Sequence, residues 1–197
     1  MYVQIEDEYI ARIPPDKLGS SYDEAIYTVA RESLEGTLRD VDVSTGGVSS
    51  RCYIISVLSI EKQGEGTIVH GDGAVYQSMK FTAVGYVPEM QEIVDGIVTS
   101  VQKFGAFIRF GPFEGLLHIS QIMDDRIDID LNNQRFIGKD TKRDLKVGDR
   151  VRVKIVAMSI PSSYIGDAKM GLTMKQPGLG KIEWLRKKRE EKIENEN

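Results

Sequence analysis

The sequence predicts an α+β protein in which an N-terminal α/β domain precedes a second domain built mainly of strands. Three observations support this prediction. Alternating hydrophobic residues, the pattern of strands with one buried face, recur in both halves of the chain. One amphipathic helix pattern with start and stop signals lies in the first half. The length of 197 residues allows one large or two small domains.

Strand patterns dominate the N-terminal half. Hydrophobic residues alternate over 1–5 and 9–13, which predicts two short strands before a pair of prolines stops the pairing. Strands are also predicted over 38–43 and 51–60, joined by a turn at residues 44–47. The strand over 51–60 is almost entirely hydrophobic, so we expect it in the middle of a sheet with both faces covered.

A single helix is predicted between these strands. Ser21 and Glu24 form a capping box at its start, and Gly36 is placed to end it. The hydrophobic residues at helical spacing, which we expect to face the core, are Ala25, Ile26, Val29, Ala30 and Leu34. Residues 75–85 alternate again and predict a long strand that leads into the second domain.

The most informative segment of the second half covers residues 96–121. Over 106–110, hydrophobic positions alternate with Phe107 and Arg109, so an aromatic ring and a guanidinium share the exposed face of a strand. After a turn, His118 is expected on the neighbouring strand, near Phe107. An aromatic ring, an imidazole and an arginine on one open sheet form a platform on which unpaired bases can stack.

The charge is unevenly distributed along the chain, whose net charge is −4. Residues 1–85 hold 7 basic and 13 acidic residues, whereas 86–180 hold 13 and 12, and 181–197 hold 6 and 5. The acidic first half argues against nucleic acid as its main partner. The nearly neutral second half predicts modest rather than tight binding of RNA.

Several classes of protein are excluded by what the sequence lacks. No hydrophobic run is long enough to cross a bilayer and the first residues do not form a secretory signal, so we expect a soluble, cytoplasmic protein without a membrane partner. With one cysteine, Cys52, and two histidines, His70 and His118, we expect no internal disulfide and no zinc site. Cys52 is predicted to be a small buried thiol. Phosphate-loop, dinucleotide and metalloprotease motifs are missing, so we expect no catalytic site, metal or cofactor in this chain.

Two further segments are predicted to be polar. Residues 123–144 form a long insertion that opens like a calcium loop, but Asn133 and Lys139 stand where that loop needs glycine and glutamate. A solvated loop is therefore the preferred prediction. Residues 181–197 form a charged tail that favours a helix, with its tryptophan and the following leucine packed at the base.

Residues 104–120, FGAFIRFGPFEGLLHIS, resemble the RNA-binding OB-fold named after ribosomal small-subunit protein one, here called the S-one (S1) domain. The match continues through residues 145–156, a later barrel strand together with its Gly-Asp turn. The resemblance implies a β-barrel with an exposed face for single-stranded RNA. The residues predicted for that face are Phe104, Phe107, Arg109 and His118, with Lys103, Arg150 and Arg152 as candidate phosphate contacts. A kink at Gly105 could instead turn Phe104 into the core.

Further blocks extend the resemblance over residues 1–185. The glycine-rich block over 64–76, the block over 88–92 and the block over 171–180 are similar to those of the archaeal RNA polymerase stalk subunits called E-prime. These are the counterparts of a eukaryotic polymerase stalk subunit. The sequence departs from the family at His70, where proline is expected.

The stalk-subunit resemblance implies three regions. Residues 1–82 would form a tip domain with a truncated RNP-like fold that docks on the polymerase core, 83–180 an S-one type OB-fold, and 181–197 a charged tail. The docking surface would contain Gly64, Gly66, Gly71, Asp72 and Gly73, although composition alone favours a flexible hairpin end for this loop. Family members form a heterodimer with a small helical stalk protein, the F subunit, and bind the emerging transcript on the barrel. They support initiation and processivity, while the chemistry occurs elsewhere in the enzyme.

Other functions remain open at this point. An RNA-exosome cap subunit also joins an N-terminal domain to an S-one barrel. It should carry a zinc ribbon, which one cysteine excludes, or a third RNA-binding domain, for which residues 181–197 leave no room. A free RNA-binding module should be basic, whereas this chain is acidic. An enzyme with an S-one specificity module would need a catalytic region, which residues 1–85 do not offer.

Overall fold

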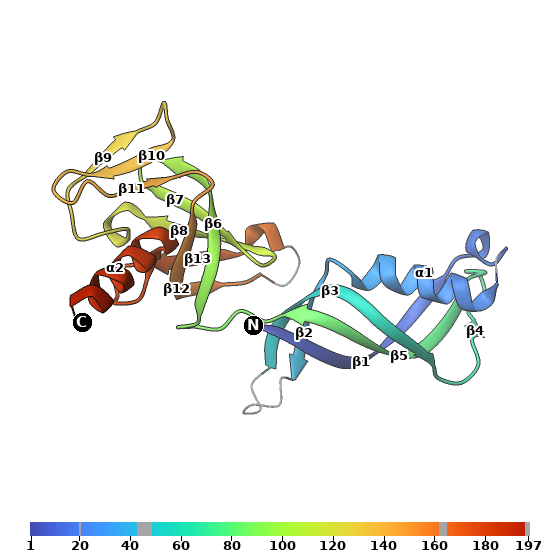
Figure 1. Cartoon of the computed structure of the whole chain (residues 1–197). Helices are drawn as coiled ribbons and strands as arrows, with labels where there is room; N and C mark the ends of the chain where they lie inside the picture. The colour runs from blue at the N-terminus through green and yellow to red at the C-terminus, as the bar shows by residue number, and fades with distance from the viewer. Residues whose placement is uncertain (20, 43–48, 162–164, 196–197) are drawn as a thin grey trace. The chain divides into compact units, whose positions relative to one another are not determined.

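The computed structural model describes residues 1–19, 21–42, 49–161 and 165–195 (Figure 1). The chain divides into two compact units, one formed by residues 1–88 and the other by residues 89–161 together with the chain from 166 onward. The boundary expected after residue 82 falls inside a strand of the first unit. Within the part of the chain that is described, no helix is both long and apolar enough to span a bilayer.

The N-terminal unit is an antiparallel sheet with one long helix (Figure 1). Its elements are β1 (Tyr2–Ile13), a 3-10 turn (Pro15–Lys17), α1 (Tyr22–Leu34), β2 (Leu38–Asp42), β3 (Ser49–Lys62), β4 (Thr67–Ile68) and β5 (Val75–Tyr86). The strands lie in the order β1-β5-β3-β2, and β4 pairs with the start of β5. Strand β1 is continuous where two short strands are predicted, because it pairs with the equally long β5 along its whole length. The predicted turn at residues 44–47 lies outside the described residues.

Helix α1 has the boundaries that the sequence predicts. The Ser21 side chain accepts a hydrogen bond from the backbone N–H of Glu24 at 3.3 Å, and the predicted hydrophobic stripe is buried. Gly36 follows the helix with φ +82°, a left-handed conformation that favours glycine. Strand β3 lies inside the sheet, as predicted, but the expectation that both its faces are covered is wrong. Ile55 and Leu58 on β3 are 37% and 52% exposed, since α1 covers only the opposite face.

Cys52, also on β3, is buried as predicted. It lies against the close approach of β3 and β5 at Gly85, where a Cβ atom would sit 2.1 Å from the cysteine sulfur. Burial raises the pKa of the Cys52 thiol to about 11. The thiol therefore stays protonated near neutral pH and packs as a small hydrophobic group.

The second unit contains a closed five-stranded barrel of the OB type, as predicted (Figure 1). Its strands are β6 (Ile93–Gln102), β7 (Gly105–Phe110), β8 (Phe113–His118), β12 (Arg150–Ser159) and β13 (Lys169–Thr173). They lie in the order β13-β8-β7-β6-β12, and β13 pairs back with β12 to close the barrel. Strand β13 runs parallel to β8, whereas the other neighbours are antiparallel. Two 3-10 turns, Ile119–Gln121 and Ile165–Asp167, follow β8 and precede β13.

The insertion between β8 and β12 is folded, so the predicted solvated loop is wrong. It forms a three-stranded antiparallel sheet of β9 (Ile127–Asp130), β10 (Arg135–Gly138) and β11 (Asp144–Lys146). Phe136 and Leu145 are fully buried and give this sheet a hydrophobic anchor. Asp130 accepts hydrogen bonds from Asn133 and Arg135 at 2.7 and 3.0 Å, which closes the turn between β9 and β10.

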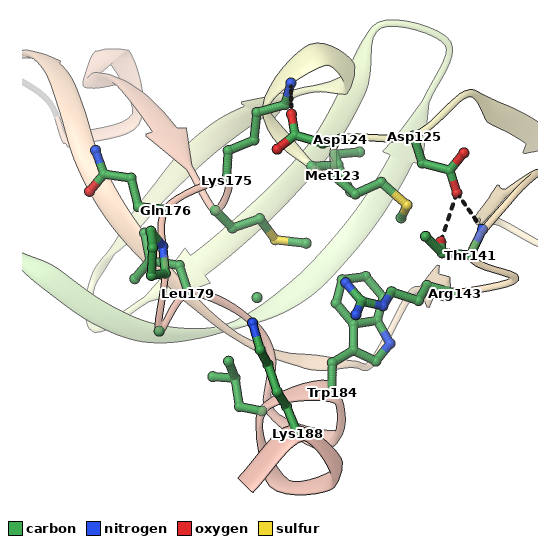
Figure 2. A pocket seen from close by; sticks show the side chains of 16 residues that line it. Met123, Asp124, Asp125, Thr141, Arg143, Lys175, Gln176, Leu179, Trp184 and Lys188 are labelled. Atoms are coloured by element: carbon green, nitrogen blue, oxygen red, sulfur yellow. Dashed lines mark hydrogen bonds and ion pairs between the residues drawn. The ribbon is translucent and has the colours of Figure 1, made fainter. Parts of the chain in front are cut away.

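The chain after β13 is anchored to the barrel. Strand β14 (Gly180–Lys181) pairs with β12, and helix α2 (Ile182–Asn195) follows directly. Trp184 and Leu185 are half-buried at the base of α2, as predicted. A pocket of about 290 Å³ lies beside this base (Figure 2). In its lining, the Arg143 guanidinium lies 5.6 Å from the centre of the Trp184 ring. Asp125, which also lines the pocket, accepts hydrogen bonds from the backbone and side chain of Thr141 at 2.9 and 2.7 Å.

Candidate nucleic-acid interface

The predicted aromatic and basic residues of β7 and β8 lie on the outer face of the barrel. On β7, Phe107 is half-buried and Arg109 is exposed, while the residues between and beside them are buried. Phe107 pairs across the strands with Leu116, and Arg109 pairs with Glu114. His118, two residues after Leu116, is exposed on the same face. The alternation in the sequence therefore predicts the facing of all three site residues correctly.

Phe104 lies in the turn between β6 and β7 and is 49% exposed, so the alternative that places it in the core is wrong. Its ring meets the Phe107 ring edge to face, with 6.2 Å between ring centres and 88° between planes. Strand β8 can approach the start of β7 closely because residue 105 is glycine. A Cβ atom at Gly105 would lie 2.3 Å from the backbone oxygen of Leu117. Lys103, next to Phe104, is exposed in the same turn.

The ring orientation of His118 is set by Ser120. The His118 Nδ1 atom lies 2.7 Å from the Ser120 hydroxyl and accepts a hydrogen bond from the Ser120 backbone N–H at 3.2 Å. These contacts hold the ring at the end of β8 and leave Nε2 as the ring nitrogen without a bond to the described residues. An exposed ring with one free nitrogen can stack on a base and also contact it by hydrogen bonding.

Phe107 and His118 line one groove of about 950 Å³ on the outer surface of the barrel. Its other wall comes from β13 and the end of β12, which lie beside β8 on the closing side of the barrel. The lining is mostly hydrophobic near Leu116 and Met158 and polar at Gln121 and Gln176. Such a groove offers apolar contact for bases and polar contact for the backbone of a nucleic acid.

The groove also contains basic residues that the sequence does not single out. Lys169 is exposed on β13, and Lys175 lies just after that strand, where it pairs with Asp124 at 2.6 Å. The resemblance block over 171–180 includes Lys175 but not Lys169, and it does not indicate which strand lies beside this segment. The parallel pairing of β13 with β8 brings this segment to Phe107 and His118, and no local pattern predicts that pairing.

Two predicted phosphate contacts lie in a different place. Arg150 and Arg152 are on β12 and line a second groove of about 370 Å³ that is formed with α2. Arg152 is engaged with Asp95 through two hydrogen bonds of 2.7 and 3.0 Å. The structure therefore groups Phe104, Phe107 and His118 around one face, but it does not place Arg150 and Arg152 in the groove that Phe107 and His118 line.

In the N-terminal unit, Asp72 anchors the glycine-rich loop to β1. Its carboxylate accepts hydrogen bonds from two nitrogens of Arg12 at 2.9 and 2.5 Å and from the Tyr76 hydroxyl at 2.7 Å. The hydrogen bond from Arg12, followed by that from Tyr76, lowers the pKa of Asp72 to about 2. Asp72 is thus committed to contacts inside the unit and fixes the loop.

The glycines of this loop have two different structural roles. Gly64, Gly71 and Gly73 have φ of +68°, +94° and +68°, which other residues rarely adopt. Gly66 allows close packing instead, because a Cβ atom there would lie 2.5 Å from the Tyr22 hydroxyl oxygen. A bulky substitution at Gly66 would therefore disturb the packing of the unit as well as the loop surface.

The loop presents hydrophobic residues to the outside. Ile68 and Val69 at its tip are 67% and 47% exposed. The base of the loop is held by the buried Gln77, whose side-chain nitrogen donates to the backbone oxygens of Gln63 and Gly64 at 3.2 and 3.4 Å. An exposed apolar tip on a fixed base is suited to docking against another protein.

Both halves of the chain match known families. Residues 8–73 match the SHS2 domain found in the N terminus of Rpb7p/Rpc25p/MJ0397, and residues 87–159 match the S1 RNA binding domain. Among solved structures, the chain resembles Mycoplasma genitalium RNase R in complex with ribose methylated single-stranded RNA, with 26% identity and a TM-score of 0.36. That match covers 43% of this chain and 13% of the other.

Relatives match over nearly the full length. The DNA-directed RNA polymerase subunit Rpo7 of Sulfolobus acidocaldarius is 37% identical over 186 residues, which cover 94% of this chain and 95% of that protein. The Rpo7 subunit of Saccharolobus shibatae is 35% identical over 187 residues, covering 94% of this chain and 97% of that protein. With both domain families present in order, the chain belongs to the Rpo7 family of DNA-directed RNA polymerase subunits.

Proposed function

We propose that this chain is a non-catalytic stalk subunit of a cytoplasmic DNA-dependent RNA polymerase and that its barrel binds the emerging single-stranded transcript. The observation that carries the RNA part is the groove that brings Phe107 and His118 together with Lys169 and Lys175. Aromatic rings and cations in an open groove suit bases and phosphates of any sequence. Membership of the Rpo7 family supports the polymerase part.

Docking on the polymerase core is assigned in this proposal to the glycine-rich loop over 64–73. The support is the fixed base at Gln77 and Asp72 and the exposed hydrophobic tip at Ile68 and Val69. Contact of the transcript with the barrel would then take place on a subunit held to the enzyme, which is how a non-catalytic chain can affect initiation and processivity.

Replacing Ile68 and Val69 with serine is expected to weaken binding to the polymerase core at least tenfold. Burying one such side chain contributes about 1.5–3 kcal/mol, and serine removes that contribution without changing the glycines. Pull-down of purified core enzyme by the full chain measures the effect. Ile10→Ser is the matched control, because Ile10 is 61% exposed on β1 of the same unit. Unchanged core binding by the loop variant would show that the loop is only a turn.

Pairing with a small helical stalk protein, the F subunit, is the third part of the proposal. The N-terminal unit exposes Tyr2 by 65%, and Ile55 and Leu58 by 37% and 52%, on β1 and β3, which α1 covers on their other face. Co-expression of the chain with this helical partner, and then size-exclusion chromatography with light scattering, is expected to give a one-to-one complex. Two separate monomers at micromolar concentration would contradict this part.

A further inference from the structure

A second cluster of basic residues lies where the barrel meets α2. Arg150 and Arg152 on β12 and Arg186 and Arg189 on α2 line one groove of about 370 Å³, and Asp95 is the acid among its lining residues. Four guanidinium groups thus share the groove with one carboxylate, in a chain whose net charge is −4. Local positive charge against an acidic background is the pattern of a polyanion site.

Most of this positive charge is unneutralised. Arg152 is the one that pairs with Asp95, at 2.7 Å. Arg150, Arg186 and Arg189 are exposed and have no ion pair with an acid among the described side chains. The pair with Asp95 also orients Arg152. Guanidinium groups bind phosphate oxygens through planar, paired hydrogen bonds, which favours a phosphate ligand over a less strongly charged one.

The barrel connects this groove to the proposed RNA face. Ile97 on β6 pairs with Arg109 on β7 and with Arg150 on β12. All three side chains are exposed, so they form a row across the outer surface of three neighbouring strands. Adjacent strands lie about 4.8 Å apart, which places Arg109 and Arg150 roughly 10 Å from each other along this row.

From the cluster and the row we propose that the groove between β12 and α2 is a second RNA site. It binds the sugar-phosphate backbone of single-stranded RNA that leaves the groove lined by Phe107 and His118, here called the stacking groove. The inference rests on the proposed RNA binding at Phe107 and His118 and extends it. The bases would be contacted in the stacking groove, and Arg150, Arg186 and Arg189 would hold phosphates of the continuing strand, with Arg109 on the row between the two grooves. Helix α2 is then part of the RNA-binding surface.

Fluorescence anisotropy with two unstructured RNAs tests the second site, using the full chain. One RNA has about 5 nucleotides, enough for the stacking groove alone, and the other about 20, which exceeds the 4–16 nucleotides that one OB-fold covers. Arg186→Gln with Arg189→Gln is expected to weaken binding of the long RNA about 10- to 30-fold near 0.1 M salt. The slope of log affinity against log salt should fall by about 1.4, or about 0.7 per lost phosphate contact. Binding of the short RNA should not change.

Lys187→Gln with Lys188→Gln is the matched control, because it removes the same charge from the same helix outside the groove. An equal loss with this control, or unchanged binding of the long RNA by the arginine variant, would overturn the second site. If the arginine variant loses more affinity for double-stranded DNA than for RNA, the ligand of this groove is a duplex and the proposal of single-stranded RNA is wrong. If Phe107→Ala with His118→Ala leaves binding of the short RNA unchanged, the proposed stacking groove is wrong. The arginine variant still tests the second site independently. If the wild-type chain binds neither RNA, the proposed stacking groove and the proposed second site are both wrong.

Discussion

Replacing Phe107 and His118 with alanine is expected to remove most of the affinity of the chain for single-stranded RNA. Loss of one stacking partner costs about 1–3 kcal/mol, which corresponds to roughly 5- to 150-fold in affinity. The two residues line the same groove, so the double substitution should reduce the affinity more than either single substitution does. Fluorescence anisotropy with an unstructured RNA measures the affinity, and circular dichroism confirms that the fold is retained.

Two control variants separate stacking from general damage. Phe107→Tyr keeps an aromatic ring in the groove and should keep most of the affinity. Tyr27→Ala removes an aromatic ring that is 41% exposed on α1, in the N-terminal unit, and should leave RNA binding unchanged. Full affinity of the folded Phe107 and His118 double variant would place the RNA site elsewhere on the chain.

The salt dependence of binding adds an independent check. Lys103, Arg109, Lys169 and Lys175 are candidate phosphate contacts on or beside the stacking groove. Each phosphate contact to a single strand contributes about 0.7 to the slope of log affinity against log salt, so three or four contacts predict a slope of about 2–3 for a short RNA. A much steeper slope would mean that binding is mainly ionic and that the rings contribute little.

Local patterns predict much of this fold because the residues that carry them act on their neighbours in the chain. The Ser21 cap and the hydrophobic stripe up to Leu34 define α1 without reference to any other element. The alternation at Phe107 and Arg109 likewise gives the facing of β7, since a strand turns successive side chains to opposite faces. These are the parts of the fold where sequence and structure agree.

Pairing between distant segments is what the patterns cannot show. Strand β13 lies parallel to β8 only because the barrel closes, and this closure brings Lys169 and Lys175 to the groove of Phe107. Arg150 shows the same limit. The alternation of β12 predicts that its side chain faces outward, but no local pattern predicts that it lies beside α2. Strand facing is a local property, whereas the identity of the neighbour depends on the whole topology.

The charged tail illustrates the same limit in one residue. Lys181 is the first residue of the charged run over 181–197 that predicts a solvated, helical end, yet its side chain is 4% exposed. It belongs to β14, and pairing of this strand with β12 places the lysine among acids from three parts of the unit. A single lysine in a charged sequence gives no sign of such burial, because two of its partners, Asp144 and Asp149, are distant in the chain.

Replacing Lys181 with methionine is expected to destabilise the C-terminal unit by about 3–5 kcal/mol, the usual cost of removing one partner from a buried ion pair. The Lys181 ammonium lies 2.9 Å from Asp149, 3.2 Å from Glu183 and 3.6 Å from Asp144. Asp149 is itself nearly buried and also accepts a hydrogen bond from the backbone of Lys146 at 2.9 Å. Without the lysine, its carboxylate would remain buried and poorly compensated.

The pH range of this effect follows from the direction of the pKa shift. Burial alone would lower the pKa of Lys181, but the hydrogen bond and charge of Asp149, with Glu183 and Asp144, outweigh it and the net shift is upward. A raised pKa in the folded state contributes stability that is complete below the unfolded value of about 10.4 and is lost as pH rises through the folded value. The difference between wild type and variant should therefore be constant across neutral pH and shrink only in strong alkali.

Denaturant unfolding followed by the fluorescence of Trp184 measures the loss, because Trp184 is the single tryptophan of the chain and lies at the base of α2. Lys187→Met is the matched control on the exposed side of the same helix and should change stability by less than about 0.5 kcal/mol. Adding Asp149→Asn to the Lys181 variant should recover part of the loss, since it removes the uncompensated charge. Equal stability of Lys181→Met and the control would show that the buried lysine does not hold β14 and α2 to the barrel.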